Sequence, residues 1–218
     1  MSEIILMSDA RVAAVPVAEN GEPLVDVRDK LLVDDRKHKD SHGAEVQLRR
    51  GVLDRLLAAQ ALLPEGLRLL FVEGYRPPAL QRRYFERYAD ELRAAHPDWP
   101  ADRILSAASR YVSPPEIAPH SAGAAVDLTL ADAEGRELDL GTEMNANPEQ
   151  SDGACYTAAA NITEEARAHR ALLGGALTAA GLVNYPTEWW HWSYGDRYWA
   201  LVTGAPAALF GPREPGDS

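Results

Sequence analysis

The chain has 218 residues, of which 46% are hydrophobic and 25% are charged, a composition typical of a globular protein with a sizeable core. Its formal net charge of −11 argues against nucleic acid or an anionic membrane as the main partner, because their phosphates would be repelled. The single cysteine, Cys155, excludes an intramolecular disulfide.

The first 44 residues are the least patterned part of the chain. They lack a basic start followed by an apolar run, and no segment anywhere reaches ~18 consecutive apolar residues. We therefore expect no signal peptide, no membrane span and a cytoplasmic location. A charge run at 34–40 contains His38 and is followed by His42, which indicates a solvated loop whose histidines have no role. Three short apolar pieces could be strands: residues 4–6, 12–17 and 31–33.

Helical and strand patterns become clear after this part. From Glu45 to Leu63 apolar residues recur at helical spacing, which predicts an amphipathic helix. The apolar run at 67–72 predicts a buried strand, and the proline pair that follows Arg76 can open a second helix. Arg76 therefore lies at a strand-to-helix junction, where its side chain can be aimed into a cleft. The second helix carries an apolar stripe that we expect to face the core: Leu80, Tyr84, Tyr88 and Leu92.

The middle of the chain predicts a short helix at 101–111 and then a stiff, proline-rich loop at 112–119. The loop is followed by His120 and by an alternating pattern at 123–130 that predicts a strand. Asp127 lies on the face of that strand opposite the apolar set, where it can meet a ligand. Residues 131–160 are polar and rich in turns, and we expect this long loop to border the site.

The C-terminal third predicts a helix that begins near Asn161 and ends at Gly181. Residues 182–185 then lead into an aromatic stretch, and the tail at 212–218 is expected to be frayed. With no repeat and no convincing linker, we expect residues 1–218 to form one α+β domain.

Two stretches carry the candidate chemistry. Glu188 and His191 lie three residues apart among tryptophans, while His120 and Asp127 supply a second imidazole and a second carboxylate. Two neutral imidazoles and one carboxylate can hold a zinc ion with a fourth position open for water. Glu188 is then available for proton transfer, and Arg76 for a developing oxyanion.

Each of these elements also has a simpler interpretation. A lone His-x6-Asp can be accidental, Glu188 and His191 can form a hydrogen-bonded core pair, and Arg76 can be an ion-paired arginine. In a regular strand Glu188 and His191 would point to opposite faces, so Glu188 must lie at the mouth of the strand, or a bulge must intervene. Two histidines and an aspartate are also the ligands of non-haem Fe(II) oxygenases, although those commonly use a closer His-x-Asp spacing.

Taken together, the motifs resemble a known family. Glu73-Gly74-Tyr75-Arg76-Pro77, Ser-Pro-Pro at 113–115, His120-Ser121-x-Gly123-x-Ala125-x-Asp127 and Glu188-Trp189-Trp190-His191 occur in the order found in VanX-type D-alanyl-D-alanine dipeptidases. These are zinc enzymes related to D,D-carboxypeptidases and to the Hedgehog signalling domain. The resemblance spans about residues 45–195 and implies a compact α+β fold with a central antiparallel sheet. It also implies roles: zinc ligands His120, Asp127 and His191, catalytic base Glu188, and Arg76 at the tetrahedral intermediate.

The chain departs from this family at positions that contact the substrate in the family. After Leu140-Gly141-Thr142 the family usually carries a Phe-Asp pair, whose aspartate pairs with the free amine of the substrate. Here the corresponding residues are Met144-Asn145, although Glu143 could substitute. The serine expected two residues before His120 is Ala118. We expect four residues to contact the substrate: Asn145, Ser121, Tyr75 and Trp190.

The sequence therefore predicts a cytoplasmic metallopeptidase with one zinc ion that cleaves a small peptide or amide, by default D-Ala-D-Ala. Three alternatives stay open. The chain could act on a different, N-blocked or metabolite-linked amide, as Asn145 suggests, or it could be an Fe(II) oxygenase. It could also be a zinc-binding module without turnover, against which the presence of both Glu188 and Arg76 argues.

Overall fold

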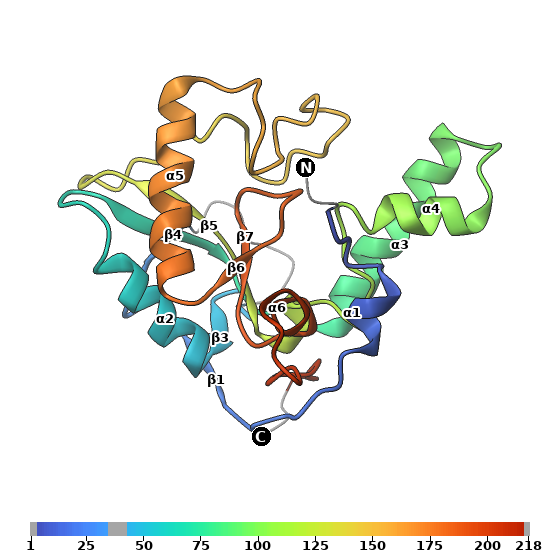
Figure 1. Ribbon diagram of the computed structural model, residues 1–218, viewed down its shortest axis with the longest axis horizontal. Coiled ribbons are helices and arrows are strands. Elements are labelled where there is room, and N and C mark those ends of the chain that lie inside the picture. Colours follow the sequence, from blue (N-terminus) through green and yellow to red (C-terminus); the bar gives the residue numbers. More distant parts are fainter. Residues whose placement is uncertain (1–3, 35–42, 216–218) are drawn as a thin grey trace.

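A five-stranded sheet lies at the centre of the fold, with the strand order β2-β4-β5-β7-β6 (Figure 1). The computed structural model describes residues 4–34 and 43–215. The predicted charged loop, with His38 and His42, lies outside these residues except for Asp34. β2 pairs with β4 in parallel and every other pair in this sheet is antiparallel. The strands are β2 (Leu32–Val33), β4 (Arg68–Glu73), β5 (Ala125–Ala131), β6 (Val183–Asn184) and β7 (His191–Ser193).

The two longest strands form because their apolar runs are covered on both faces. All seven residues of β5 are buried, as are the four central residues of β4. Strands buried on both faces read as nearly continuous apolar runs, as 67–72 does, whereas 123–130 was recognisable from its alternating pattern. In the register, Asp127 of β5 pairs with Glu73 of β4 on one side and with His191 of β7 on the other. A register shift between Phe71 and Glu73 accompanies this alignment.

Helices α2 (Arg50–Gln60) and α5 (Glu164–Ala179) pack against each other beside the sheet (Figure 1). In α5, Ala166, Leu173 and Leu177 are buried, and Gly181, the predicted end of this helix, adopts φ 88° just after it. The first helix was predicted from Glu45, but it begins at Arg50. The preceding residues form β3 (Gln47–Arg49), which pairs with β1 (Leu24–Asp26). Backbone hydrogen bonds also tie this segment to residues 74–75 and 123, so its polar groups are satisfied outside a helix.

The N-terminal part corrects a second prediction. Residues 12–17 were a candidate strand, but α1 (Ala10–Ala14) is a short helix, whereas the candidate at 31–33 does contain β2. Asp9 caps α1 by accepting a hydrogen bond from the Arg11 amide. Val12 is buried in a small cluster with Tyr185 and Tyr198. A short apolar run does not distinguish a strand from a buried helical turn. Here the Asp9 cap and the packing of Val12 in the cluster favour the helical turn.

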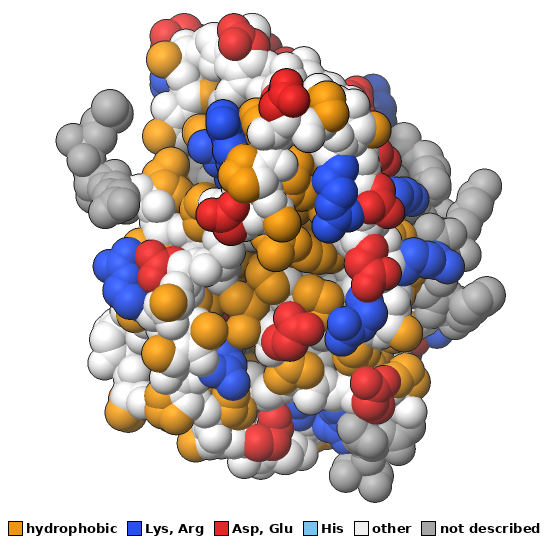
Figure 2. Space-filling view, turned by 90° about the vertical axis from the view of Figure 1, so that its right-hand side faces the viewer, with side chains coloured by type: hydrophobic (Ala, Val, Ile, Leu, Met, Phe, Trp, Pro, Cys, Tyr) orange, Lys and Arg blue, Asp and Glu red, His pale blue; other side chains and the backbone are white. Residues whose placement is uncertain are grey.

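Helices α3 (Pro78–Ala95) and α4 (Ala101–Ala108) pack together at the right of Figure 1, and the short α6 (Arg197–Thr203) packs against α1. On the side of the molecule seen in Figure 2, acidic and basic side chains are interspersed among hydrophobic ones and neither sign gathers into one area. Among the described residues no helix combines the length and apolarity needed to cross a membrane.

The C-terminal segment is held more firmly than the expected frayed tail. The Arg213 amide donates a hydrogen bond to the Ser121 carbonyl, and the Arg213 carbonyl accepts one from the Tyr75 hydroxyl at 2.6 Å. The chain is therefore anchored at least as far as Arg213, beside the segment that carries His120. Together the layers form a mixed α+β domain whose sheet is flanked by helices.

Candidate active site

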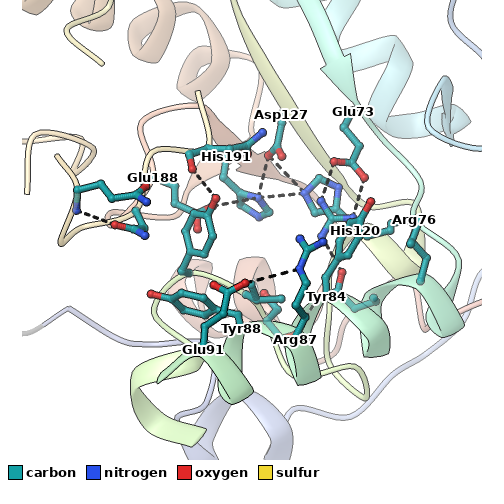
Figure 3. Close-up of a pocket in the computed structure, with 18 residues that line it drawn as sticks. Glu73, Arg76, Tyr84, Arg87, Tyr88, Glu91, His120, Asp127, Glu188 and His191 are labelled. Carbon is teal, nitrogen blue, oxygen red and sulfur yellow. Dashed lines mark hydrogen bonds and ion pairs between the residues drawn. The ribbon is translucent and has the colours of Figure 1, made fainter. Parts of the chain in front are cut away.

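Three side chains converge at the aligned positions of the sheet. His120 opens the short 3₁₀ turn η1 (His120–Ala122), Asp127 lies in β5, and His191 begins β7. His120 Nε2 lies 3.2 Å from His191 Nδ1, while Asp127 Oδ1 lies 3.3 Å from the first atom and 3.1 Å from the second. All three residues are buried, and Figure 3 shows them meeting at one wall of a cavity.

A hydrogen bond to the backbone orients the His120 imidazole. His120 Nδ1 lies 2.6 Å from the Gly74 carbonyl, which can only accept, so Nδ1 carries a proton and Nε2 is left for other partners. His120 Nε2 faces a carboxylate oxygen of Asp127 and the second imidazole. Burial alone would raise the pKa of Asp127, but His120 and His191 outweigh it and hold that pKa well below its usual range. Asp127 is therefore ionised.

The dimensions of this triangle fit a zinc ion. Zinc lies about 2.0–2.1 Å from its histidine nitrogens, so two ligand atoms of a tetrahedral site are about 3.4 Å apart. The three ligand atoms here are separated by 3.1, 3.2 and 3.3 Å. Converging acceptors at tetrahedral spacing, with one negative charge among them, are suited to a dipositive cation.

Glu188 lies in a turn immediately before β7, and not in the strand. Its amide donates to the Tyr185 carbonyl, and its own carbonyl accepts from the His191 amide. The turn brings the Glu188 carboxylate to 3.8 Å from His191 Nδ1, which removes the objection that a regular strand would separate the two side chains. Burial, and then the nearby Asp127 carboxylate, raise the pKa of Glu188 well above its usual value, while Arg76 opposes the shift.

Arg76 is held at the other end of the site by two partners. Its Nε and Nη2 donate to the two carboxylate oxygens of Glu73 at 2.6 and 2.7 Å, and its Nη1 donates to Gln81 Oε1 at 2.8 Å. The Gln81 amide in turn donates to the Ser113 carbonyl. Burial alone would lower the pKa of Arg76, but the Glu73 carboxylate more than offsets it and raises that pKa. The guanidinium is therefore a fixed positive charge.

These groups border a cavity of about 410 Å³. The long loop at 131–160 reaches it through Asn145, Asn147 and Gln150, as expected of a segment that borders the site. The rest of the lining comes from three places: Glu73, Arg76, Leu80, Gln81, Tyr84, Arg87, Tyr88 and Glu91 around α3; Tyr111, Val112 and Ser113 after α4; and the site residues His120, Asp127, Glu188 and His191.

The predicted core stripe of α3 is correct only in part. Leu80 and Leu92 are buried, but Tyr84 and Tyr88 line the cavity and are half-buried (Figure 3). The core contacts of this helix come instead from Ala89 and Leu92, which pack against α4. Aromatic residues at helical spacing do not reveal whether they face packed side chains or a solvent-filled hollow.

Of the four predicted substrate contacts, Asn145 lines the cavity and the other three do not. The Ser121 hydroxyl donates to the Arg76 carbonyl, so it supports the segment that carries the arginine. Tyr75 points away from the cavity, because neighbours in an extended segment alternate, and it bonds to the C-terminal segment. Trp190 is buried in the main core, edge-on to Trp189. The structure thus places these three side chains outside the lining of the cavity.

Several lining residues were not predicted from the sequence. Glu73 had a detectable signal, since it is a carboxylate at the end of an apolar strand and three residues before Arg76. Gln81, Tyr111 and Asn147 had none, because each is brought to the cavity by the way separate segments pack. Glu143, which could have replaced the missing aspartate, lies in a separate hollow with Glu137 and Trp189.

Comparison with known proteins places these features in a family. Residues 37–203 match the D-ala-D-ala dipeptidase family of peptidases. A D-alanyl-D-alanine dipeptidase of Synechocystis sp. is 29% identical over 221 residues, covering 86% of this chain and 87% of that protein. The Escherichia coli D-alanyl-D-alanine dipeptidase is 29% identical over 126 residues, covering 58% of this chain and 54% of that protein.

Similar solved structures are more distant. The vancomycin-resistance D,D-pentapeptidase VanY in complex with Zn(II) has 16% identity and a TM-score of 0.42, over 85% of this chain and 93% of that one. The LD-carboxypeptidase LdcB has 19% identity and a TM-score of 0.45, over 87% and 77%. The family match spans well over half of the sequence and includes every residue of the converging site. The chain therefore belongs to the D-ala-D-ala dipeptidase family and is a metallopeptidase.

Proposed function

We propose that this chain is a zinc-dependent hydrolase of a small peptide amide ending in D-alanine, with D-Ala-D-Ala as the default substrate. The observation that carries the proposal is the triangle of ligand atoms from His120, Asp127 and His191, which has the spacing of a tetrahedral zinc site. These three residues would hold one zinc ion. A zinc ion bound there supplies a Lewis acid that lowers the pKa of water to roughly 7 and polarises a carbonyl group.

Glu188 is suited to move the proton in this reaction. Its carboxylate borders the cavity beside the proposed ligands, and its raised pKa lets it keep a proton taken from the attacking water until the amine leaves. The same group can then deliver that proton to the leaving nitrogen. Its position in a turn before β7, close to His191, supports this role.

Arg76 is suited to stabilise the negative charge that develops on the carbonyl oxygen of the substrate. It lines the cavity as a fixed positive charge, and the hydrogen bonds that it donates to Glu73 and Gln81 hold it in place before the substrate arrives. A donor fixed in advance does not have to reorganise as negative charge develops, and removing one such donor typically lowers the rate by about 100- to 1,000-fold. The family match favours this hydrolytic function over the oxygenase alternative.

The test is to load the purified chain with zinc and measure release of D-alanine from D-Ala-D-Ala and from N-acetyl-D-Ala-D-Ala. We expect turnover of at least one of them, loss of turnover with a chelator, and recovery with added zinc. A stoichiometrically loaded protein that hydrolyses neither compound would refute the proposal. Dependence on Fe(II) and 2-oxoglutarate would point to the oxygenase alternative instead.

A further inference from the structure

The cavity extends well beyond the residues that the proposed reaction requires. Successive turns of α3 contribute Leu80, Tyr84, Arg87, Tyr88 and Glu91 to its lining. From Leu80 to Glu91 the helix rises about 16 Å, at roughly 1.5 Å per residue. A fully extended dipeptide spans about 7 Å. The part of α3 that lines the cavity, which we call the trough, is therefore about twice as long as a dipeptide, and Figure 3 shows Tyr84, Tyr88 and Glu91 along it.

The walls of this extension are aromatic and polar. The rings of Tyr88 and Tyr111 pack edge to face with centroids 5.2 Å apart, and the Tyr111 hydroxyl donates to the Asn145 carbonyl. Asn145 itself is held in the left-handed region at φ 65°, and the Asn147 side chain accepts a hydrogen bond from the Gln150 amide. The 145–150 segment is thus a structured wall joined to the end of α4.

The carboxylates in the lining already have partners among the described residues. Glu73 binds Arg76, Asp127 contacts both histidines, and Glu91 lies 4.0 Å from Arg87. The fourth, Glu188, is the proposed proton carrier and lies beside His191. Just outside the lining, Glu149 accepts a hydrogen bond from the Tyr88 hydroxyl. A substrate ammonium group entering the trough would therefore have to compete for a carboxylate that already has a partner or a proposed role.

The 145–150 segment contributes side-chain amides, and not carboxylates, to the lining of the trough. Asn145, Asn147 and Gln150 all line the cavity, and an amide side chain can both donate to a carbonyl and accept from an N–H. These groups complement the neutral backbone of a peptide or an acyl amide. They cannot form the ion pair that makes a free amine favourable in a partly buried site.

We propose that this chain prefers substrates whose amine is acylated, and that the acyl-bearing part lies in the trough between α3 and the 145–150 segment. The inference rests on the proposed hydrolysis and specifies the substrate class of that same site. Water is added across the C-terminal amide bond: the C–N bond breaks, a C–O bond forms, and the products are an N-acylated amino acid with a new carboxylate and a free D-amino acid.

The experiment uses the full zinc-loaded chain and three compounds: D-Ala-D-Ala, N-acetyl-D-Ala-D-Ala and N-acetyl-Gly-D-Ala-D-Ala. We expect kcat/KM to be at least about tenfold higher for the acetylated dipeptide than for the free one, and no lower for the longer compound. A higher kcat/KM for free D-Ala-D-Ala would overturn this inference while leaving the proposed hydrolysis intact. Hydrolysis of none of the three would refute both.

A single substitution at Asn145 tests whether the side-chain amide at this position favours acylated substrates over free amines. Asn145→Asp adds a carboxylate without changing the size of the side chain, and aspartate tolerates the left-handed conformation as asparagine does. We expect the ratio of kcat/KM for acetylated over free dipeptide to fall about tenfold, mainly through a lower KM for the free dipeptide. Glu143→Gln, in the separate hollow, is the matched control and should leave the ratio unchanged. An unchanged ratio in a folded, zinc-loaded Asn145→Asp variant would contradict the assignment.

The length of the trough is tested separately. Tyr88→Leu removes an aromatic surface from its outer part. We expect kcat/KM for the acetylated tripeptide to fall about fivefold more than kcat/KM for the acetylated dipeptide, because the longer compound alone reaches that far. Equal losses for the two compounds would show that the acyl-bearing part lies elsewhere.

Discussion

Glu73 and Arg76 form a two-pronged ion pair inside the cavity wall, with hydrogen bonds of 2.6 and 2.7 Å and both side chains 13% exposed. The pair joins the last residue of β4 to the segment that opens α3. Its planar geometry leaves the guanidinium little freedom. We therefore propose that Glu73 is a positioning residue, which acts on the proposed reaction through Arg76.

Two substitutions separate the charge of Arg76 from its placement. Arg76→Lys keeps the charge but cannot make the same paired hydrogen bonds, and we expect kcat to fall about 100-fold. Glu73→Gln keeps Arg76 but weakens its anchor, and we expect kcat to fall about tenfold while KM and zinc content stay unchanged. Steady-state kinetics and metal analysis check both. A Glu73→Gln variant that changes KM alone would contradict the positioning role.

Removing the carboxylate of Glu188 should abolish turnover while the metal is retained. Glu188 is proposed to carry the proton and not to bind zinc, so Glu188→Gln should keep full zinc content and lose at least about 100-fold in kcat. Glu143→Gln is the control, because this carboxylate lies in the other hollow. Substantial activity in zinc-loaded Glu188→Gln would show that another group moves the proton.

The metal should contribute to folding stability as well as to catalysis. Zinc that binds the folded chain and not the unfolded one raises the free energy of unfolding, by about 4 kcal/mol when the free metal is 1,000 times its Kd. We expect a chelator to lower the Tm, and added zinc to restore it. His191→Ala should lose the metal and show no response of Tm to zinc. Full zinc occupancy in that variant would contradict the ligand assignment.

Without zinc, the buried Glu188 should make stability depend on pH. Its pKa is raised in the folded state, so between the unfolded value of 4.5 and the raised value the folded chain holds more protons than the unfolded chain. The contribution of Glu188 to stability is then full below pH 4.5 and declines as the pH rises. We expect zinc-free Glu188→Gln to gain stability relative to the zinc-free wild type as the pH is raised from 4.5 to 8. Urea titrations at several pH values measure this, and a difference that is independent of pH would contradict it.

Arg170 should determine the order of the long loop that carries the cavity wall. This buried side chain donates to the carbonyls of Leu140, Tyr156 and Ala154 at 2.7–2.8 Å. Arg170→Met would leave those carbonyls without their donor, and we expect a loss of stability on the order of 3 kcal/mol. Hydrogen exchange should increase across 140–156. Arg167→Met removes an arginine with longer bonds, of 3.3–3.5 Å, and serves as the control with a smaller effect.

Much of the local structure could be read from the residues because it reflects local patterns. The apolar run of β4, the alternation of β5 and the helical periodicity of α5 predicted these elements, since burial leaves a characteristic apolar pattern in each kind of element. The types of the candidate ligands were also evident, because imidazole and carboxylate are the side chains that zinc binds. The wrong predictions of secondary structure had a different cause. At 12–17 and at 45–49, the backbone conformation was decided by a cap and by hydrogen bonds to distant segments.

The sequence by itself determined which side chains could do chemistry, and which helices and long strands would carry most of them. Tertiary structure alone decided that Glu73, Asp127 and His191 align across three strands, and that a turn brings Glu188 to them. It also decided that Tyr84 and Tyr88 face a cavity and that Tyr75 does not. The physical reason is that hydrophobic periodicity reports that a face is covered, but not what covers it. The strand register and the path of a long loop depend on contacts between residues far apart in the chain.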